Sequence, residues 1–185
     1  MTVSPPDPPL SDGVVTLRPW QRRDVDPIRG ALDGDEEIAQ WLDLIPQPYT
    51  KDDARAWVES TEMSWREGSG YPFAVVDATS GELLGGIGMR WNDATNAVGE
   101  VGYWARREAR GRGVTTRALR LVTAWALTQA GCERLVLRAD VDNVPSQRVA
   151  ERAGFVREGI ERSARFNARR GRRVDFVVYS RLPGE

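Results

Sequence analysis

The chain has 185 residues, 41% of them hydrophobic and 29% charged, with a formal net charge of −1; this favours one globular domain with a sizeable core and gives no sign of a nucleic-acid partner. It contains no histidine and a single cysteine, Cys132, which excludes a Ser-His-Asp triad, a Cys-His pair, a histidine-ligated metal site and an internal disulfide. No apolar run is long enough to suggest a membrane span, so we expect a reduced, cytoplasmic protein without a bound metal.

The first segment is rich in proline. Four prolines lie between Met1 and Leu10, and the basic and apolar pattern of a signal peptide is missing. We therefore expect a disordered leader at residues 1–12, followed by a single domain at residues 13–185.

The first half of that domain alternates between strand and helix patterns. A β-branched alternation follows the leader, and Thr50 with Asp53 resembles a capping box at a helix start. Thr79-Ser80-Gly81 is typical of a hairpin turn. These patterns predict a strand at 14–18, helices at 24–32, 36–44 and from Thr50 to about Gly68, and strands at 71–77, 82–90 and 97–105.

The second half continues the alternation. Apolar residues recur at helical spacing from Val114 to Trp125, and Gly154-Phe155 is typical of a helix end. We expect a helix from Val114 to about Gly131, a strand at 134–141, a helix at 146–153 and strands at 156–159 and 173–181. The strand–helix–strand order implies one parallel pair with a crossover helix, whereas the hairpins imply antiparallel pairs. The predicted fold class is therefore α/β (α+β): one mixed sheet, mostly antiparallel with one central parallel pair, with helices on both faces.

The segment Arg110-Gly111-Arg112-Gly113-Val114-Thr115 joins a strand to a helix. The first amides of a helix lack intrahelical partners and lie at the positive end of its dipole, and glycines let a backbone approach an anion closely. This combination predicts a binding site for a pyrophosphate. The segment lacks the Gly-Lys-Ser/Thr of a Walker loop and is not G-x-G-x-x-G. A solvated basic loop that needs its glycines for a turn is the alternative.

Arg110-x-x-Gly113-x-Thr115 resembles the pyrophosphate motif Q/R-x-x-G-x-G/A of the GNAT acyltransferases. Thr115 departs from that motif, which has Gly or Ala there, and we expect its hydroxyl to donate a hydrogen bond to the phosphate.

A second motif supports the same resemblance. Asn143-x-x-Ser146, followed by Gly154-Phe155, is similar to the second cofactor element of that superfamily, and residues 174–182 resemble its closing strand. The nearest branch is the RimJ/RimL-type ribosomal-protein N-terminal acetyltransferases, and the resemblance covers residues 14–182. It implies a GNAT-like domain that binds acetyl-coenzyme A (acetyl-CoA).

The resemblance also implies which residues hold the cofactor. Backbone groups of Tyr103, Trp104 and Ala105 would bind its pantetheine arm, and Asn143 would bond the same arm. The pyrophosphate would be wrapped by Arg110, Gly111, Arg112, Gly113, Val114, Thr115 and Thr116. Core packing is the alternative for Tyr103 and Trp104, and a helix cap or turn is the alternative for Asn143.

Acyl transfer to an amine needs a neutral amine and a proton for the leaving thiolate. Glu100, on the strand that enters the loop, is the candidate base, with a surface ion pair as its alternative. Ser146 is the candidate acid, as the resemblance implies, with a helix-start residue as its alternative. Many GNAT enzymes have a tyrosine seven residues after the Asn, where this chain has Ala150. Cys132 is interpreted as a packing residue.

Two charged regions complete the analysis. Residues 33–49 are expected to help form the acceptor pocket, with Asp33, Asp35, Glu36, Glu37 and Asp43 either attracting a cationic amine or forming a solvated face. The basic run 169–173 is expected to cap a hairpin, with RNA binding as a weaker alternative.

The resemblance therefore implies an acetyl-CoA-dependent N-acetyltransferase that works by direct attack in a ternary complex, as a monomer or homodimer. The expected acceptor is a protein or peptide N-terminal α-amine. A small-molecule amine (an antibiotic or an amino acid) is an alternative acceptor, and a non-catalytic acyl-CoA-binding module is an alternative function.

Overall fold

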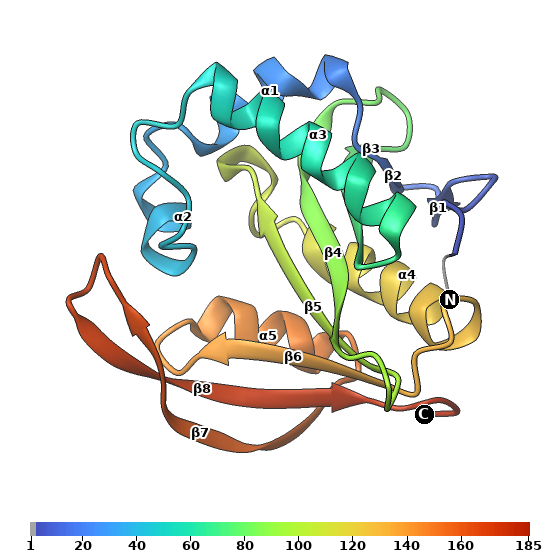
Figure 1. Ribbon diagram of the computed structural model, residues 1–185, viewed down its shortest axis with the longest axis vertical. Coiled ribbons are helices and arrows are strands. Elements are labelled where there is room, and N and C mark those ends of the chain that lie inside the picture. The colour runs from blue at the N-terminus through green and yellow to red at the C-terminus, as the bar shows by residue number, and fades with distance from the viewer. Residues whose placement is uncertain (1–2) are drawn as a thin grey trace.

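The computed structural model describes residues 3–185. Within them, one eight-stranded sheet runs in the order β1-β2-β3-β4-β5-β6-β8-β7 (Figure 1). Its strands are β1 (Leu10–Ser11), β2 (Val15–Pro19), β3 (Gly70–Asp77), β4 (Leu83–Asp93), β5 (Val98–Ala105), β6 (Arg134–Asp140), β7 (Val156–Asn167) and β8 (Arg172–Arg181). Neighbouring strands are antiparallel except β5 and β6, which are parallel.

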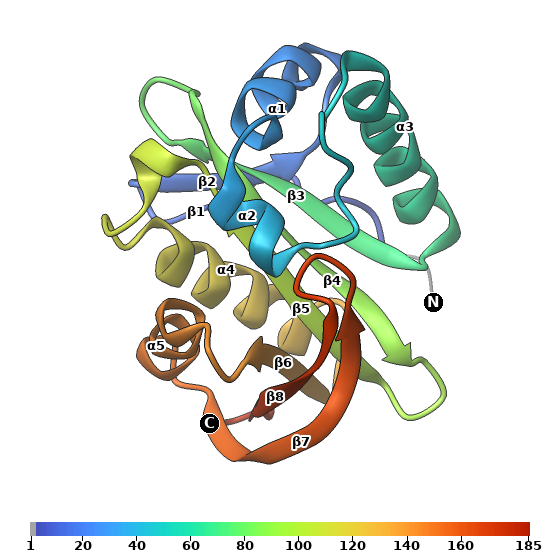
Figure 2. The ribbon, with the colours of Figure 1, turned by 90° about the vertical axis from the view of Figure 1, so that its left-hand side faces the viewer.

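The helices lie on both faces of this sheet. They are α1 (Val25–Leu32), α2 (Glu36–Trp41), α3 (Lys51–Glu67), α4 (Val114–Thr128) and α5 (Val144–Arg152), with short 3-10 turns η1 (Arg22–Asp24) and η2 (Arg107–Ala109). α1 and α3 cover one face and α4 the other, while α5 packs against α4 and β6 (Figure 2). No helix in residues 3–185 has the length and apolarity needed to cross a membrane.

The strand period of two divides the core between the two faces. Phe73 and Val75 of β3 belong to the core that includes α4, whereas Ala74 and Val76 belong to the core beneath α1 and α3. The larger core contains an aromatic cluster, in which the ring of Trp125 lies 5.2 Å from that of Tyr71 and 5.4 Å from that of Phe73. This packing holds the middle strands rigidly between two helical layers.

The parallel pair separates soon after it forms. Only three residues of β5 have a partner in β6, namely Val98, Gly99 and Glu100. β5 then continues to Ala105 beside β4, and β6 continues to Asp140 beside β8, so the two strands diverge (Figure 1). A gap therefore opens in the middle of the sheet, between the ends of β5 and β6.

The predicted fold class, the single parallel pair and the helices on both faces are confirmed. The hairpin turn at Thr79-Ser80-Gly81 is also present, with Gly81 at φ +73°. The prediction ended the strand that starts at 156 too early, because β7 extends to Asn167. β7 is an exposed edge strand, so the charged residues of its second half hide the strand pattern.

Part of the predicted leader contacts the domain within the described residues. Leu10 and Ser11 pair with Leu17 and Thr16 of β2, and Val3 and Leu10 pack against the core. At these residues, pairing and apolar contacts offset the loss of chain entropy. Residues 1–2 of the predicted leader lie outside the described part.

Candidate active site

The loop predicted to bind pyrophosphate leads directly from β5 into α4. Gly111 has φ +72° and Gly113 has φ +76°, and a Cβ built on either glycine would meet no atom of residues 3–185 within 4 Å. Gly113 is the N-cap of the 15-residue helix α4 and supplies no side-chain cap. The first amides of α4 thus face an open space beside a bare backbone, which is an arrangement suited to an anion.

The two arginines of this loop have different surroundings. The guanidinium of Arg110 lies 2.6 Å from Asp35 and 2.8 Å from Glu37, and its Nε donates to the carbonyl of Ala105 at 3.2 Å. Arg110 therefore holds α2 against the loop, and two carboxylates offset its charge. Arg112 is exposed, with a 3.4 Å contact to the carbonyl of Glu108, and its charge helps to lower the pKa of Asp77.

Asp35 is the buried partner in this contact between α2 and the loop. Its side chain is 6% exposed and also accepts from the amide of Ile38 at the start of α2. Burial alone would raise its pKa, but the Ile38 amide and the Arg110 guanidinium outweigh burial and lower the pKa below its ordinary value. Asp35 is thus ionised at neutral pH and fixes the position of Arg110.

The three residues predicted to bind pantetheine lie at the end of β5, beside the gap. β4 pairs with one edge of Tyr103, Trp104 and Ala105, and in residues 3–185 no strand pairs with the other edge beyond Glu100. Apart from the Ala105 carbonyl, which accepts from Arg110, backbone groups on that open edge can bind an extended chain. The side chains of Tyr103 and Trp104 go to opposite faces: Trp104 stacks on Trp20, with ring centroids 6.2 Å apart, and Tyr103 reaches α5.

Asn143 is the N-cap of α5, where its Oδ1 accepts from the amide of Ser146 at 3.1 Å. The helix-cap alternative therefore describes this contact, which uses only the carbonyl oxygen of the Asn143 side chain.

Val114 and Thr116 are buried in α4, whereas Thr115 is half-buried at the first turn. A Thr115 hydroxyl contact to a phosphate stays a prediction.

Ser146 meets Tyr103, a pairing that the sequence does not signal. The Tyr103 hydroxyl lies 2.9 Å from the Oγ of Ser146 and donates to the Ser146 carbonyl at 3.1 Å. Burial raises the pKa of Tyr103 to about 12, although the bond to Ser146 opposes this. Ala150, where the resemblance implies a tyrosine in many GNAT enzymes, is fully buried, so no phenol comes from that position.

Glu100, the candidate base, has two guanidinium partners. Arg138 lies 2.9 Å from one of its oxygens and Arg90 lies 3.3 Å from the other. The Glu100 side chain is 18% exposed and lines a cavity. Of these two partners, Arg90 is the more exposed, at 71% against 23% for Arg138.

A cavity of about 700 Å³ lies on the α1–α3 side of β4 and β5. Leu42, Leu44, Ile45 and Tyr49 line it, so residues 33–49 do contribute to its wall. The acidic residues of that region have other positions. Asp35 and Glu37 contact Arg110, Asp43 contacts Arg165 at 2.8 Å, Asp33 accepts from the amide of Tyr49, and Glu36 is exposed.

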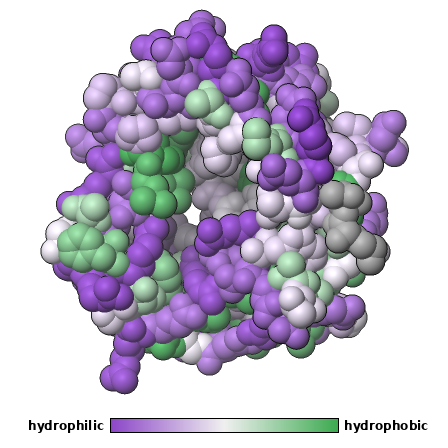
Figure 3. Space-filling view, in the orientation of Figure 1, coloured by the Kyte–Doolittle hydropathy of each residue, from purple (hydrophilic) through white to green (hydrophobic). Residues whose placement is uncertain are grey.

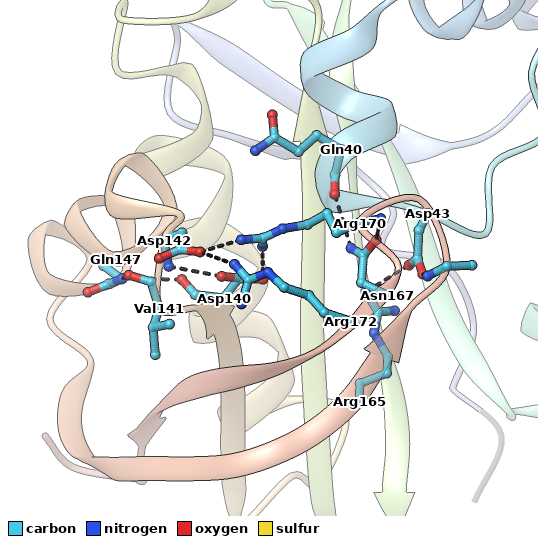
Figure 4. A network of polar contacts seen from close by, with 11 residues as sticks. Gln40, Asp43, Asp140, Val141, Asp142, Gln147, Arg165, Asn167, Arg170 and Arg172 are labelled. Atoms are coloured by element: carbon cyan, nitrogen blue, oxygen red, sulfur yellow. Dashed lines mark hydrogen bonds and ion pairs between the residues drawn. The ribbon is translucent and has the colours of Figure 1, made fainter.

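The hairpin between β7 and β8 connects α2 with the end of β6 through polar contacts (Figure 4). Arg170 pairs with Asp140 at 2.7 Å and with Asp142, which Arg172 also contacts. On the opposite side of the hairpin, Asn167 donates to the carbonyl of Gln40 at 3.2 Å.

The basic run of this hairpin is thus used inside the protein, as a hairpin cap. Arg169 donates to the carbonyl of Ile45, and Arg173 donates to Ser163.

The space-filling view shows an opening at the centre of the molecule (Figure 3). Cys132 is 1% exposed, and burial raises the pKa of its thiol, in keeping with a packing residue.

The chain resembles known proteins over most of its length. Residues 15–156 match the model of the acetyltransferase (GNAT) domain. The chain is 28% identical over 178 residues to the putative ribosomal N-acetyltransferase YdaF of Bacillus subtilis (strain 168), covering 92% of each chain. It is 29% identical over 131 residues to the ribosomal-protein-serine acetyltransferase of Escherichia coli (strain K12), covering 71% of this chain and 70% of the relative.

Solved structures have the same fold. A probable acetyltransferase, 26% identical, superposes with a TM-score of 0.83 over 95% of this chain and 96% of the other. The RimL ribosomal L7/L12 α-N-protein acetyltransferase in complex with coenzyme A, 22% identical, superposes with a TM-score of 0.82 over 94% of this chain and 96% of the other. At that identity, the second likeness concerns the fold alone.

Proposed function

Since the chain belongs to the acetyltransferase (GNAT) domain family, we propose that it transfers an acetyl group from acetyl-CoA to a protein or peptide N-terminal α-amine. The reaction proceeds by direct attack while both substrates are bound. One arrangement carries the proposal: β5, with an open edge beyond Glu100, leads through η2 into the helix start at Gly113, which has no side-chain cap.

The residues present fit acetyl-CoA. The open edge at Tyr103 and Ala105 suits the extended pantetheine arm, because the amides of that arm need hydrogen-bond partners. The glycine backbone and first amides of α4, with Arg112, suit the pyrophosphate. Arg110 contributes by holding the loop to α2, since Asp35 and Glu37 occupy its guanidinium.

The acceptor side of the reaction needs a neutral amine. A free α-amino group has a pKa of about 7.7–8.0, so an appreciable fraction is neutral at pH 7, whereas a lysine at about 10.4 is almost wholly charged. A modest base suffices for the first but not for the second. Glu100, at the wall of the cavity, is the carboxylate that takes the proton, and Arg90 then moves away from it.

The donor side needs an acid. Acetyl-CoA supplies the acetyl group as a thioester, and its thiolate must be protonated on leaving. Ser146 delivers that proton from its Oγ, the Tyr103 hydroxyl at 2.9 Å passes its own proton to the Ser146 oxygen, and Tyr103 regains a proton from solvent before the next turnover. With a pKa of about 12, Tyr103 is protonated at the start of each turnover at physiological pH.

The acceptor class is supported by the relatives. Two of them are named as acetyltransferases of ribosomal proteins, which favours a protein N-terminus over a free small molecule. The experiment is an assay of thiol release from acetyl-CoA with peptides that have a free or a blocked N-terminus. Since Cys132 is buried, a thiol reagent will report the released coenzyme with little background. If neither peptide caused thiol release and a small amine did, the acceptor would be a small-molecule amine instead of a protein N-terminus.

A further inference from the structure

Two glycines form the floor of the cavity. In the register of β4 and β5, Gly88 lies opposite Gly102. The pairs on either side of them, on the same face of the sheet, are Gly86 with Trp104 and Arg90 with Glu100. The floor is therefore bare backbone, between an aromatic end at Trp104 and a charged end at Glu100.

The two floor glycines have different reasons to lack a side chain. A Cβ on Gly88 would lie 3.0 Å from the Cα of Pro72, so a side chain there would crowd the neighbouring strand β3. A Cβ on Gly102 would meet nothing within 4 Å among residues 3–185, and Gly102 does not have a positive φ. Neither packing nor backbone conformation requires glycine at 102. What its bare backbone provides is space in the cavity.

The walls around this space are largely apolar. They include Trp20, Leu32, Leu42, Ile45, Tyr49 and Trp57. The charged lining residues of the described chain are already engaged: Asp53 bonds Thr50 at the start of α3, Arg90 pairs with Glu100, and Arg165 pairs with Asp43. A charged substrate side chain would thus meet charges that already have partners, except that the Nε of Arg165 has no hydrogen bond within residues 3–185, whereas an apolar one would be desolvated favourably.

The volume also discriminates between substrates. A cavity of about 700 Å³ is within the range of pockets that enclose a drug-sized ligand. A serine or alanine side chain would leave most of it unfilled. A leucine or phenylalanine side chain would use both the bare floor at Gly102 and the aromatic wall at Trp104.

Resting on the proposed function, we propose that the enzyme selects acceptors whose first residue has a large apolar or aromatic side chain. That side chain lies over Gly102, towards Trp104, and the α-amine lies towards Glu100. Burial of such a side chain predicts a kcat/KM about 10- to 100-fold higher for Leu or Phe than for Ser or Ala as the first residue.

The test uses four peptides that differ only in the first residue: Ser, Ala, Leu and Phe. Thiol release gives kcat/KM for each, and mass spectrometry locates the acetyl group. In Gly102→Val the Leu:Ser and Phe:Ser ratios should fall towards one, and in Gly102→Ala they should fall by less. Gly159→Val is the matched control, because Gly159 is also a strand glycine with nothing within 4 Å of its built Cβ. Its ratios should equal those of the wild type, and the melting temperatures of all variants show whether they are folded.

Two results would overturn the selectivity, and they differ from failure of the proposed function. Equal or higher kcat/KM for Ser and Ala in the wild type would refute the apolar pocket but keep N-terminal acetylation. A preference for Leu and Phe that Gly102→Val leaves intact in a folded protein would refute the role of Gly102. Coenzyme A binding with no acetylation of any of the four peptides would defeat the proposed function, and the selectivity with it.

Discussion

The hydroxyl of Tyr103, on β5, lies 2.9 Å from the Oγ of Ser146, on α5, although 43 residues separate them. β5 ends beside the gap and α5 begins after β6, so this bond crosses the place where the two parallel strands have separated. A serine alone is a weak proton donor. A serine joined to the half-buried phenol of Tyr103 has a second proton within one hydrogen bond.

Ser146→Ala and Tyr103→Phe should each lower kcat about 10- to 1,000-fold and leave coenzyme A affinity nearly unchanged, because a proton donor acts chiefly in the transition state. The double variant should lose little more than the worse single variant, since both substitutions break one shared bond. Steady-state kinetics and a binding titration check this. Because the pKa of Tyr103 is about 12, the wild type should show no loss of activity from its ionisation between pH 6 and about pH 10.

Tyr179→Phe is the matched control for the phenol. Tyr179 is fully buried, whereas Tyr103 is half-buried, and the Tyr179 hydroxyl bonds Glu151 instead of Ser146. Its kcat should stay close to that of the wild type. If Ser146→Ala weakened coenzyme A binding and preserved kcat, Ser146 would be a binding or capping residue instead.

Glu100→Gln should lower the rate most where the acceptor is mainly charged, because the variant cannot take up the proton. The deficit should shrink as the pH rises past the acceptor's pKa, at about pH 8–9 for an α-amine and only above about pH 10 for a lysine. A pH–rate profile of both proteins checks this.

Glu161→Gln separates proton transfer from ion pairing, because Glu161 shares Arg138 with Glu100. We expect this control to keep the wild-type pH profile. A Glu100→Gln deficit that is constant across pH would make Glu100 a positioning residue.

Coenzyme A should stabilise the folded chain by about 2.7 kcal/mol at a hundredfold excess over its Kd. For a domain of this size, that raises the melting temperature by roughly 5–11 °C. Gly113→Asp should abolish the shift, because it places a carboxylate at the N-terminus of α4.

Gly131→Asp is the control for strain in that variant. Gly131 has φ +73° against φ +76° at Gly113, and both have open space at the built Cβ. Gly131 lies beyond the opposite end of α4, so the shift with coenzyme A should persist. A shift that survives in Gly113→Asp would place the anion site elsewhere.

Asp35→Asn should destabilise the chain by about 1.5–3 kcal/mol at pH 7, the usual cost of losing a charged hydrogen bond at a buried site. Since the folded state lowers the pKa of Asp35 from 3.8, the wild-type advantage is present above that value and declines as the pH falls through the folded pKa. Urea unfolding at pH 7 and pH 3 checks this. Glu37→Gln, which alters an exposed partner of the same arginine, should cost less than about 0.5 kcal/mol.

Much of the fold could be predicted because the local signals agree with the tertiary structure. The predicted strand at 97–105, helix from Val114 and strand at 134–141 all lie within one or two residues of β5, the start of α4 and β6. β7 was predicted too short because an exposed edge strand carries charges on both faces. β1 was missed because its two residues gain their stability from pairing with β2.

The candidate site likewise has residues that could be predicted from the sequence and residues that could not. Contiguous motifs such as Arg110 to Thr115 can be read from the sequence, because a glycine-bearing loop before a helix has a local physical meaning. The partners of Arg110, Glu100 and Ser146 could not be predicted, because Asp35, Arg138 and Tyr103 come from distant segments. The sequence therefore gives the charged residues but does not show which of them form ion pairs in the folded chain.

The location of the transferred acetyl group tests the central claim most directly. One peptide has a leucine with a free α-amine at its N-terminus and no lysine, and a second has a blocked N-terminus and one lysine. Each is incubated with the enzyme and acetyl-CoA near pH 7.5 and mapped by mass spectrometry. We predict an acetyl group on the α-amine of the first peptide and none on the second. Acetylation confined to the lysine, or none on either peptide while coenzyme A binds, would contradict N-terminal α-amine acetylation.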